Sequence, residues 1–356
     1  MPSSSKNGSP NPSDQGDQDA FGGFAEGELG AHYSIRNGKV RQVVDLDNEL
    51  LIITTDRISA FDRILGLVPF KGEMLSRLSE YWFSATSDII PNHHLHGITG
   101  RTMLVRACQP LPVEVVVRGY LSGSAWRDYA AGRPVSGIQL PPGLRQDQLL
   151  PQPILTPSTK AEQGLHDAPI SSAEIIETGL VESDLWRQVE LVALELFARG
   201  TQLAAERGLV LVDTKYEFGV APDGSLMLID ELHTPDSSRF KPREAQQSPP
   251  GDTQPSGVEQ SPPGEPQPSG VEQSPPGEPQ QPAQRLDKEY LREWLMQQGW
   301  SGEGEPPAIP PEVFAETAER YKKSFALLCG EEFSPTSTSH EAERMQILSF
   351  LSNRES

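Results

Sequence analysis

The sequence predicts an α+β protein, because strand-like and helix-like runs occur in separate groups and not in regular alternation. Strand-like runs flank turn residues at 39–55 and 209–232, so each region is expected to form a β-hairpin. A further strand is expected at PVEVVVRGYL, residues 112–121. Apolar residues at helical spacing predict helices over 73–84, 171–178, 184–207, 287–298 and 311–328.

Composition limits the classes of function. The 356 residues include 30 Lys and Arg against 50 Asp and Glu, a net charge of −20, which argues against nucleic-acid binding because phosphate neutralisation needs a basic surface. The only cysteines, Cys108 and Cys329, lie in no metal-ligand spacing and suggest no disulfide framework. No apolar run reaches the roughly 20 residues of a membrane span, and the first 20 residues resemble no targeting signal. A cytoplasmic protein without a membrane or nucleic-acid partner is expected, and the oligomeric state is left open.

Three segments are expected to lie outside the main fold. Residues 1–30 are mostly polar and small and are predicted to form a disordered tail. Residues 244–284 contain a Pro-rich repeat with a period of 13 residues, predicted to be a disordered insertion, with a docking site for a partner as the alternative. Residues 331–356 form a C-terminal tail whose amphipathic piece, 341–351, is either a packed helix or a frayed end.

The hairpin at 209–232 carries the most specific chemical pattern. Residues two apart in a strand share a face, so Asp213, Lys215 and Glu217 project from one side. A two-residue turn at Asp223-Gly224 would place Glu217 opposite Asp230, and like charges across a ladder are favourable when a cation lies between them. Mg²⁺ with one or two carboxylates and substrate phosphates fits such a pair. A solvated charged face is the alternative, and a three-residue turn would shift the register by one.

Polar segments at 115–126, 156–167 and 230–240 have the composition of ligand-binding loops. Basic residues stand in or near them despite the negative net charge, which favours an anionic small ligand; they are Lys39, Arg41, Arg118, Lys160, Lys215 and Arg239. The chain contains neither GxxxxGK[ST] nor GxGxxG, so neither a P-loop nor a Rossmann site is expected.

Seven ordered motifs carry a family resemblance: GKVRQVVDL, TTDRISAFD, PFKGEMLSRLSEYWF, PVEVVVRGYLSGSAW, TPSTKAEQGLHD, LVDTKYEFG and DELHTPDSSRF. They resemble those of phosphoribosylaminoimidazole-succinocarboxamide (SAICAR) synthetases over roughly 33–243 and 286–330. The resemblance implies a two-lobed α+β fold related to ATP-grasp enzymes and protein kinases. It implies an N-terminal lobe over ATP at 31–117, and a substrate and metal lobe at 118–243 and 285–330.

The resemblance also implies a reaction. ATP with Mg²⁺ would phosphorylate the carboxylate of carboxyaminoimidazole ribonucleotide (CAIR), and the amine of L-aspartate would then displace phosphate to give SAICAR. A kinase-like phosphotransferase acting on a small anionic substrate is the alternative. Carried over by position, the residue roles are ATP binding by Lys39 and Arg41, metal binding by Glu217 and Asp230, substrate binding by Arg118, Ser124, Lys160, His166, Asp167, Ser238 and Arg239, and catalysis by Lys215, Asp213 and Asp236.

Overall fold

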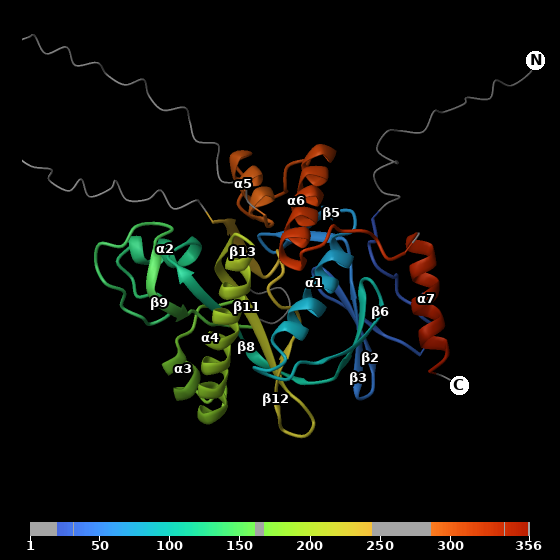
Figure 1. The fold of residues 1–356 in the computed structure, drawn as a ribbon, viewed down its shortest axis with the longest axis horizontal. Helices are drawn as coiled ribbons and strands as arrows, with labels where there is room; N and C mark the ends of the chain where they lie inside the picture. Colours follow the sequence, from blue (N-terminus) through green and yellow to red (C-terminus); the bar gives the residue numbers. More distant parts are fainter. Residues whose placement is uncertain (1–19, 31, 161–166, 244–285, 338, 355–356) are drawn as a thin grey trace, which may run out of the picture.

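The computed structural model describes residues 20–30, 32–160, 167–243, 286–337 and 339–354. His166 and the predicted insertion at 244–284 lie outside these residues. Two antiparallel sheets form the body of the molecule (Figure 1). The first has the strand order β1 (Ile35–Asn37), β2 (Arg41–Leu46), β3 (Glu49–Thr54), β7 (Thr102–Arg106) and β6 (His94–Thr99). In the second, β10 (Ser158–Thr159), β8 (Gln109–Tyr120), β11 (Leu209–Val220) and β12 (Leu226–Ile229) follow in order, with β9 (Leu149–Leu155) on β8 and β13 (Ser238–Pro242) on β11.

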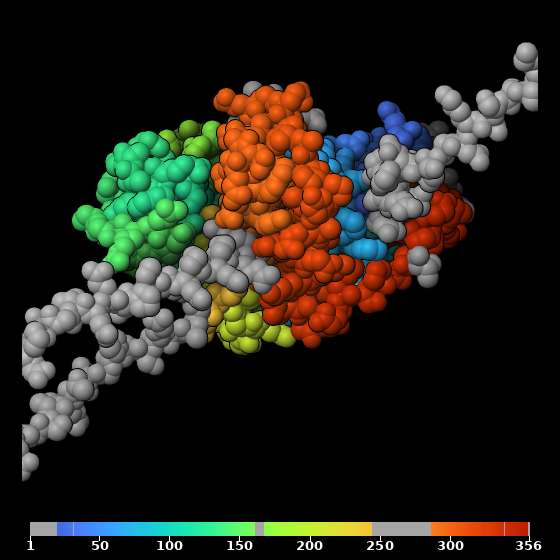
Figure 2. All heavy atoms as spheres, turned by 90° about the horizontal axis from the view of Figure 1, so that it is seen from above, coloured from blue at the N-terminus to red at the C-terminus, as the bar shows by residue number. Residues whose placement is uncertain are grey.

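The remaining elements are a small hairpin and seven helices within the described residues. The hairpin joins β4 (Arg57–Ala60) to β5 (Arg63–Leu67). The helices are α1 (Lys71–Ala85), α2 (Gly123–Ala130), α3 (Ser172–Glu177), α4 (Ser183–Glu206), α5 (Glu289–Gln297), α6 (Pro311–Cys329) and α7 (His340–Ser352). Seen from above, α5 and α6 lie over the middle of the molecule (Figure 2). No helix among the described residues is long and apolar enough to span a membrane.

Both predicted hairpins and all five predicted helices are present, so the predicted α+β class is confirmed. Local signals set several helix ends. Ser171 and Glu174 form a capping box at the start of α3, and Gly208, with φ of 70°, follows α4 where a residue with a Cβ would be strained. Pro311 occupies the first turn of α6, where its missing N–H costs no hydrogen bond.

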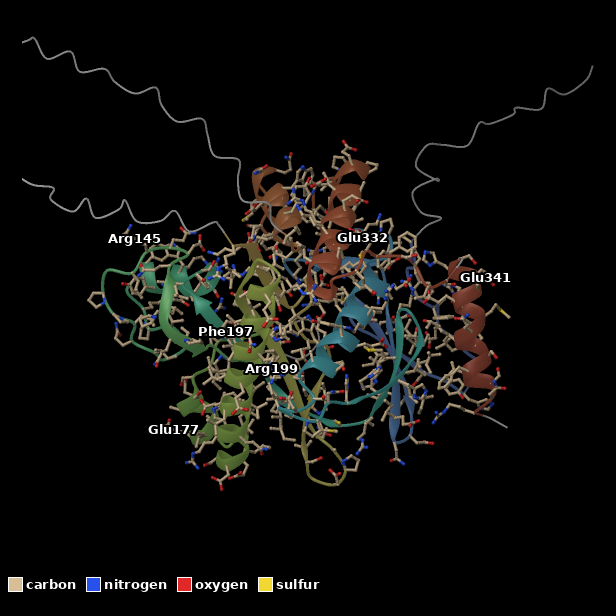
Figure 3. All side chains as sticks on the ribbon, viewed as in Figure 1. Arg145, Glu177, Phe197, Arg199, Glu332 and Glu341 are labelled. Carbon is tan, nitrogen blue, oxygen red and sulfur yellow. The ribbon has the colours of Figure 1, made fainter. Side chains whose placement is uncertain are left out.

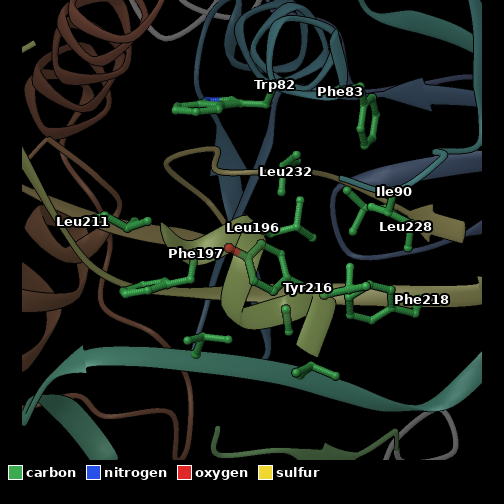
Figure 4. Close-up of a cluster of buried hydrophobic side chains, with 14 of the residues drawn as sticks. Trp82, Phe83, Ile90, Leu196, Phe197, Leu211, Tyr216, Phe218, Leu228 and Leu232 are labelled. Atoms are coloured by element: carbon green, nitrogen blue, oxygen red, sulfur yellow. The ribbon is translucent and has the colours of Figure 1, made fainter. Parts of the chain in front are cut away.

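The predicted lobe boundary at 117/118 is wrong, because it falls inside β8. This strand pairs with β11 from Gln109 onward, so residues 109–117 belong to the second sheet. Helix α1, which was assigned to the N-terminal lobe, contributes Trp82 to the main hydrophobic core. That core lies between β11 and α4, where Tyr216 and Phe218 meet Leu196 and other apolar side chains (Figure 4). The two lobes therefore share their largest core.

The prediction of a disordered tail over 1–30 is wrong for residues 20–30. Phe21, Phe24 and Leu29 are buried on the first sheet together with Ile347 and Leu351 of α7. The amphipathic C-terminal piece is therefore a packed helix, α7. Figure 3 shows this helix on the outer side of β6, with Glu341 labelled in its first turn. Residues 1–19 lie outside the described part of the chain.

A buried ion cluster joins this packing to α1. The guanidinium of Arg101 donates to Asp56 at 2.8 Å and to Glu343 of α7 at 2.6 Å, and all three side chains are at most 1% exposed. Asp56 also accepts the backbone N–H of Phe21 and that of Gly72 in the first turn of α1. The N-terminal segment and the start of α1 therefore meet at the Asp56 carboxylate, and Arg101 links α7 to it through Glu343.

We expect Glu343→Ala to destabilise the protein by about 3–5 kcal/mol, because it removes one of the two carboxylates that pair with the buried guanidinium of Arg101. The control is Glu341→Ala, which removes an exposed carboxylate from the same helix and should cost less than about 1 kcal/mol. Urea unfolding of both variants measures the difference. Equal effects would show that the cluster adds nothing to stability.

Candidate active site

Two pockets open on either side of one shared wall. The first, about 530 Å³, lies over the ends of β8, β11 and β13 and has Arg118, Ser124 and Arg239 in its lining. The second, about 490 Å³, lies between the first sheet and the segment after β12, with Lys39 and Glu217 in its lining. Residues that line both are Phe61, Lys215, Asp236, Lys288 and Arg292. Groups bound in the two pockets would thus meet at a wall with three basic residues and one acid.

Sheet register builds the basic end of the first pocket. Asp213 of β11 is paired with Arg118 on one neighbouring strand and with Arg239 on the other. Its carboxylate accepts from Arg118 Nη1 at 2.9 Å and from Arg239 Nε at 2.8 Å. Burial acts to raise the pKa of Asp213, but the hydrogen bonds and charge of Arg239, together with Arg118, hold it below its usual value.

Arg118 is oriented further by neutral partners. Its Nε donates to Thr156 Oγ1 at 2.8 Å and its Nη2 to Ser124 Oγ at 2.9 Å. One carboxylate between two guanidiniums leaves a net positive charge at this end of the pocket. Such a pair suits a phosphate, because guanidinium N–H groups match the geometry of its oxygens. Ser238, also predicted to bind substrate, is buried and shares a hydrogen bond with Thr214 in the same wall.

The second pocket collects acids and lysines. Lys215 contacts Glu217, lies 3.1 Å from Glu114, and lies 3.9 Å from Asp230. Lys160 donates to the other oxygen of Glu217 at 2.5 Å. Burial acts to raise the pKa of Glu217, but the two ammonium groups outweigh it and keep the carboxylate ionised. Burial raises the pKa of Asp230 to about 6, although Arg41 opposes the shift.

The expected register of the β11–β12 hairpin is wrong by one residue. Ala221 and Ser225 close a three-residue turn, so Glu217 lies opposite Ile229 and not opposite Asp230. Asp230 follows the last residue of β12 and has φ of 69°, a left-handed conformation that ends the alternation of the strand. Both acids still line the second pocket, because this backbone bend, rather than strand pairing, directs Asp230.

Two basic residues from outside the second sheet hold the segment after β12. Arg41 of β2 bonds Asp230 at 2.7 Å and Glu231 at 2.8 Å. Lys71, fully buried in the first turn of α1, lies 2.8 Å from Asp236. The structure therefore gives Arg41 two carboxylate partners, while its predicted role in ATP binding stays a prediction.

Asp236 is the acid of the shared wall. Besides its contact with Lys71, it accepts a hydrogen bond from Tyr321 of α6 at 2.5 Å. Burial acts to raise its pKa, but Lys71 leads the charges and hydrogen bonds that lower it well below the usual range. Asp236 is therefore a carboxylate held in one orientation and a weak base.

Three other predicted site residues, Lys39, Asp167 and His166, have fewer described contacts in the site. Lys39 lines the second pocket and pairs with Asp62, and Asp167 lines the same pocket. His166 lies outside the described residues, so its predicted role is not tested. Sequence reasoning missed Lys71, Tyr321, Lys288 and Arg292, which sit in ordinary helical patterns. Lys71 and Lys288 stand at the starts of α1 and α5, but no local pattern in the sequence marks any of the four as a site residue.

Comparison with known proteins identifies the family of the chain. A family model described as SAICAR synthetase matches residues 34–257, more than half of the chain. The phosphoribosylaminoimidazole-succinocarboxamide synthase of Bacteroides thetaiotaomicron is 41% identical over 326 residues, covering 90% of this chain and 95% of that one. The chain therefore belongs to the SAICAR synthetase family. Its activity is accordingly that of a ligase in purine biosynthesis.

Further relatives support the same assignment. The synthase of Halorhodospira halophila is 41% identical over 309 residues, covering 83% of this chain and 94% of that one. The structure of SAICAR synthase from Saccharomyces cerevisiae, complexed with SAICAR, aligns with a TM-score of 0.69 at 31% identity, covering 88% of this chain and 100% of that one. A SAICAR synthetase in complex with ADP shares the fold, with a TM-score of 0.60 at 21% identity.

We expect Arg118→Ala and Arg239→Ala each to raise the KM for CAIR tenfold or more, because a charge-assisted hydrogen bond to phosphate contributes roughly 1.5–3 kcal/mol. The KM for ATP should change less than about threefold, since the nucleotide is expected in the other pocket. Arg133→Ala, which removes an exposed arginine paired with Asp128, is the control. Equal weakening of both substrates would place these arginines at the nucleotide instead.

Proposed function

We propose that ATP binds in the second pocket and CAIR in the first, and that the γ-phosphoryl group crosses the shared wall to the carboxylate of CAIR. L-Aspartate then attacks the acyl phosphate to give SAICAR, ADP and phosphate. The observation that carries this proposal is the pair of pockets that meet at Lys215, Asp236, Lys288 and Arg292. The related yeast structure complexed with SAICAR supports a binding site for the product in this fold.

A magnesium ion fits the donor set of the second pocket. Within the described residues no three or more His, Cys, Asp or Glu side chains form a metal cluster. Mg²⁺ in ATP-using sites, however, often takes only one or two carboxylates and completes its shell with phosphates and water. Glu217 and Asp230 supply two such carboxylates in one pocket. Bound there, the ion would neutralise charge on the phosphates of ATP.

The chain's own residues would orient the reactants. Arg118 and Arg239 hold the phosphate of CAIR, which directs its carboxylate toward the shared wall. Lys215 carries its charge on the line between the pockets, where burial acts to lower its pKa but Glu217 and Asp230 keep it protonated. A fixed ammonium at this point stabilises negative charge on the transferring group, which is the main catalytic requirement in phosphoryl transfer.

The alternative of a kinase-like phosphotransferase differs in its dependence on aspartate. We also propose that the fold is related to those of ATP-grasp enzymes and protein kinases, as the family resemblance implies. A kinase would release ADP and a stable phosphorylated product from ATP and one acceptor. A ligase needs three substrates for turnover.

We expect sustained ADP release only when ATP, CAIR and L-aspartate are all present, because the acyl phosphate must be consumed before the next cycle. A coupled ADP assay with each substrate omitted in turn measures this dependence. A stable phosphorylated CAIR formed at full rate without aspartate would instead support the kinase alternative.

We expect Glu217→Gln and Asp230→Asn to lower turnover by at least about tenfold and to reduce the preference for Mg²⁺-ATP over metal-free ATP, because each removes a charged oxygen ligand. Equilibrium binding of ATP with and without Mg²⁺ provides the second readout. Asp223→Asn, in the exposed turn of the same hairpin, is the matched control. An unchanged magnesium preference in both site variants would reject these two acids as ligands.

A further inference from the structure

Lys288 differs from the other basic residues of the shared wall. Lys215 contacts Glu217, and Arg292 lies 3.5 Å from Glu289. Lys288 lines both pockets as they do, but it forms no ion pair or hydrogen bond with any side chain of the described residues. It directly precedes α5, which lies at the top of the molecule in Figure 1. Its amine is therefore available to a bound reactant.

The second half of the reaction needs such a group. The amine of free aspartate is an ammonium ion near neutral pH, and it must lose a proton before it can attack a carbonyl carbon. Among the described residues, Asp236 is the only acid that lines both pockets, and it is held by Lys71 and Tyr321. A carboxylate stabilised by those contacts is a poor proton acceptor.

We propose that Lys288 is the general base that accepts a proton from the amine of L-aspartate. This role rests on the proposed function and names the group that activates its third substrate. Neutral Lys288 takes one proton from the ammonium, and the lone pair of the amine attacks the acyl carbon. The C–N bond forms, and the bond between the acyl carbon and the oxygen that bridges to phosphorus breaks, leaving its electron pair on that oxygen. The second proton leaves with the phosphate as HPO₄²⁻, and Lys288 remains as an ammonium until it returns its proton to water.

The surroundings of Lys288 favour a neutral amine. Burial lowers its pKa and outweighs the opposing charge of Asp236, which raises it. The charged groups that act on it come from three parts of the fold: Asp236 and Glu231 of the segment after β12 raise its pKa, whereas Arg292 of α5 and Lys71 of α1 lower it. The lowered pKa moves this lysine toward the range in which a general base works near neutral pH.

A nucleophile that is already neutral distinguishes a general base for aspartate from a residue that acts on phosphoryl transfer. Hydroxylamine is largely unprotonated at pH 7, so it attacks an acyl phosphate without a base and gives a hydroxamate. Lys288→Met removes the amine, and Lys288→Arg keeps a positive charge that cannot be lost near neutral pH. Both variants should lose aspartate-dependent SAICAR formation by about 100-fold or more, the contribution typical of a general base. Hydroxamate formation from ATP and CAIR should stay within about threefold of wild type.

The pH dependence gives a second signature. The deficit of both variants with aspartate should shrink as pH rises, because solvent then deprotonates the amine. Lys322→Met, an exposed lysine on α6 that pairs with Glu319, is the control and should match wild type in both reactions. Thermal unfolding establishes that each variant is folded.

Two outcomes would overturn the proposal. If both reactions fell together and Lys288→Arg restored both, Lys288 would act on the transferring phosphoryl group. If aspartate-dependent turnover stayed within a few fold of wild type in Lys288→Met, the residue would have no role in the chemistry. Failure of wild-type enzyme to form hydroxamate would instead count against the acyl phosphate, and so against the proposed function itself.

Discussion

The site depends on how the segment from Asp230 to Arg239 is held. It leaves β12 through a left-handed residue and returns as β13, and along this path its charged side chains pair with residues of other elements. Arg41 of β2 holds the start, Lys71 of α1 holds Asp236 and Asp213 of β11 holds Arg239. Because these partners come from both sheets and from α1, the two pockets exist only when the lobes are packed together.

This arrangement explains a site rich in positive charge in a chain of net charge −20. Most basic residues of the two pockets are paired with acids, so the folded protein does not bury uncompensated cations. Pairing also fixes side-chain orientation before substrate arrives, which reduces the entropy lost on binding. Lys288, which has no paired side chain among the described residues, stands out against this background, and that contrast supports a chemical role for its amine.

The structure also ties the site to distant parts of the chain. Asp56 accepts hydrogen bonds from the guanidinium of Arg101 and from the backbone N–H of Gly72, the residue next to Lys71. Glu343 holds the other side of Arg101, so α7 lies only a few side chains from Asp236. The C-terminal helix therefore supports the start of α1, which in turn supports an acid of the site.

Periodic patterns predicted the strands and helices well, because local burial sets their period. The sequence motifs also identified site residues such as Arg118, Asp213 and Arg239, which the sheet register does bring together.

Three features could not be predicted from local sequence patterns. The turn at Pro222-Asp223-Gly224 is compatible with either of two loop lengths, and sequence does not choose between them. Phe21 is buried only because α7, far away in sequence, covers it, and composition alone made this segment look unfolded. Lys71 reaches Asp236 through tertiary packing, which leaves no local pattern.

The central claim, that Lys71 acts on the site through Asp236, is tested most directly by a double-mutant cycle. Lys71→Met, Asp236→Asn and the double variant would be compared in kcat and in unfolding free energy. The account predicts strong coupling: the double variant should be no slower than Asp236→Asn alone, and it should recover much of the roughly 3–5 kcal/mol lost when Lys71→Met strands a buried carboxylate. Additive losses in both quantities would contradict it.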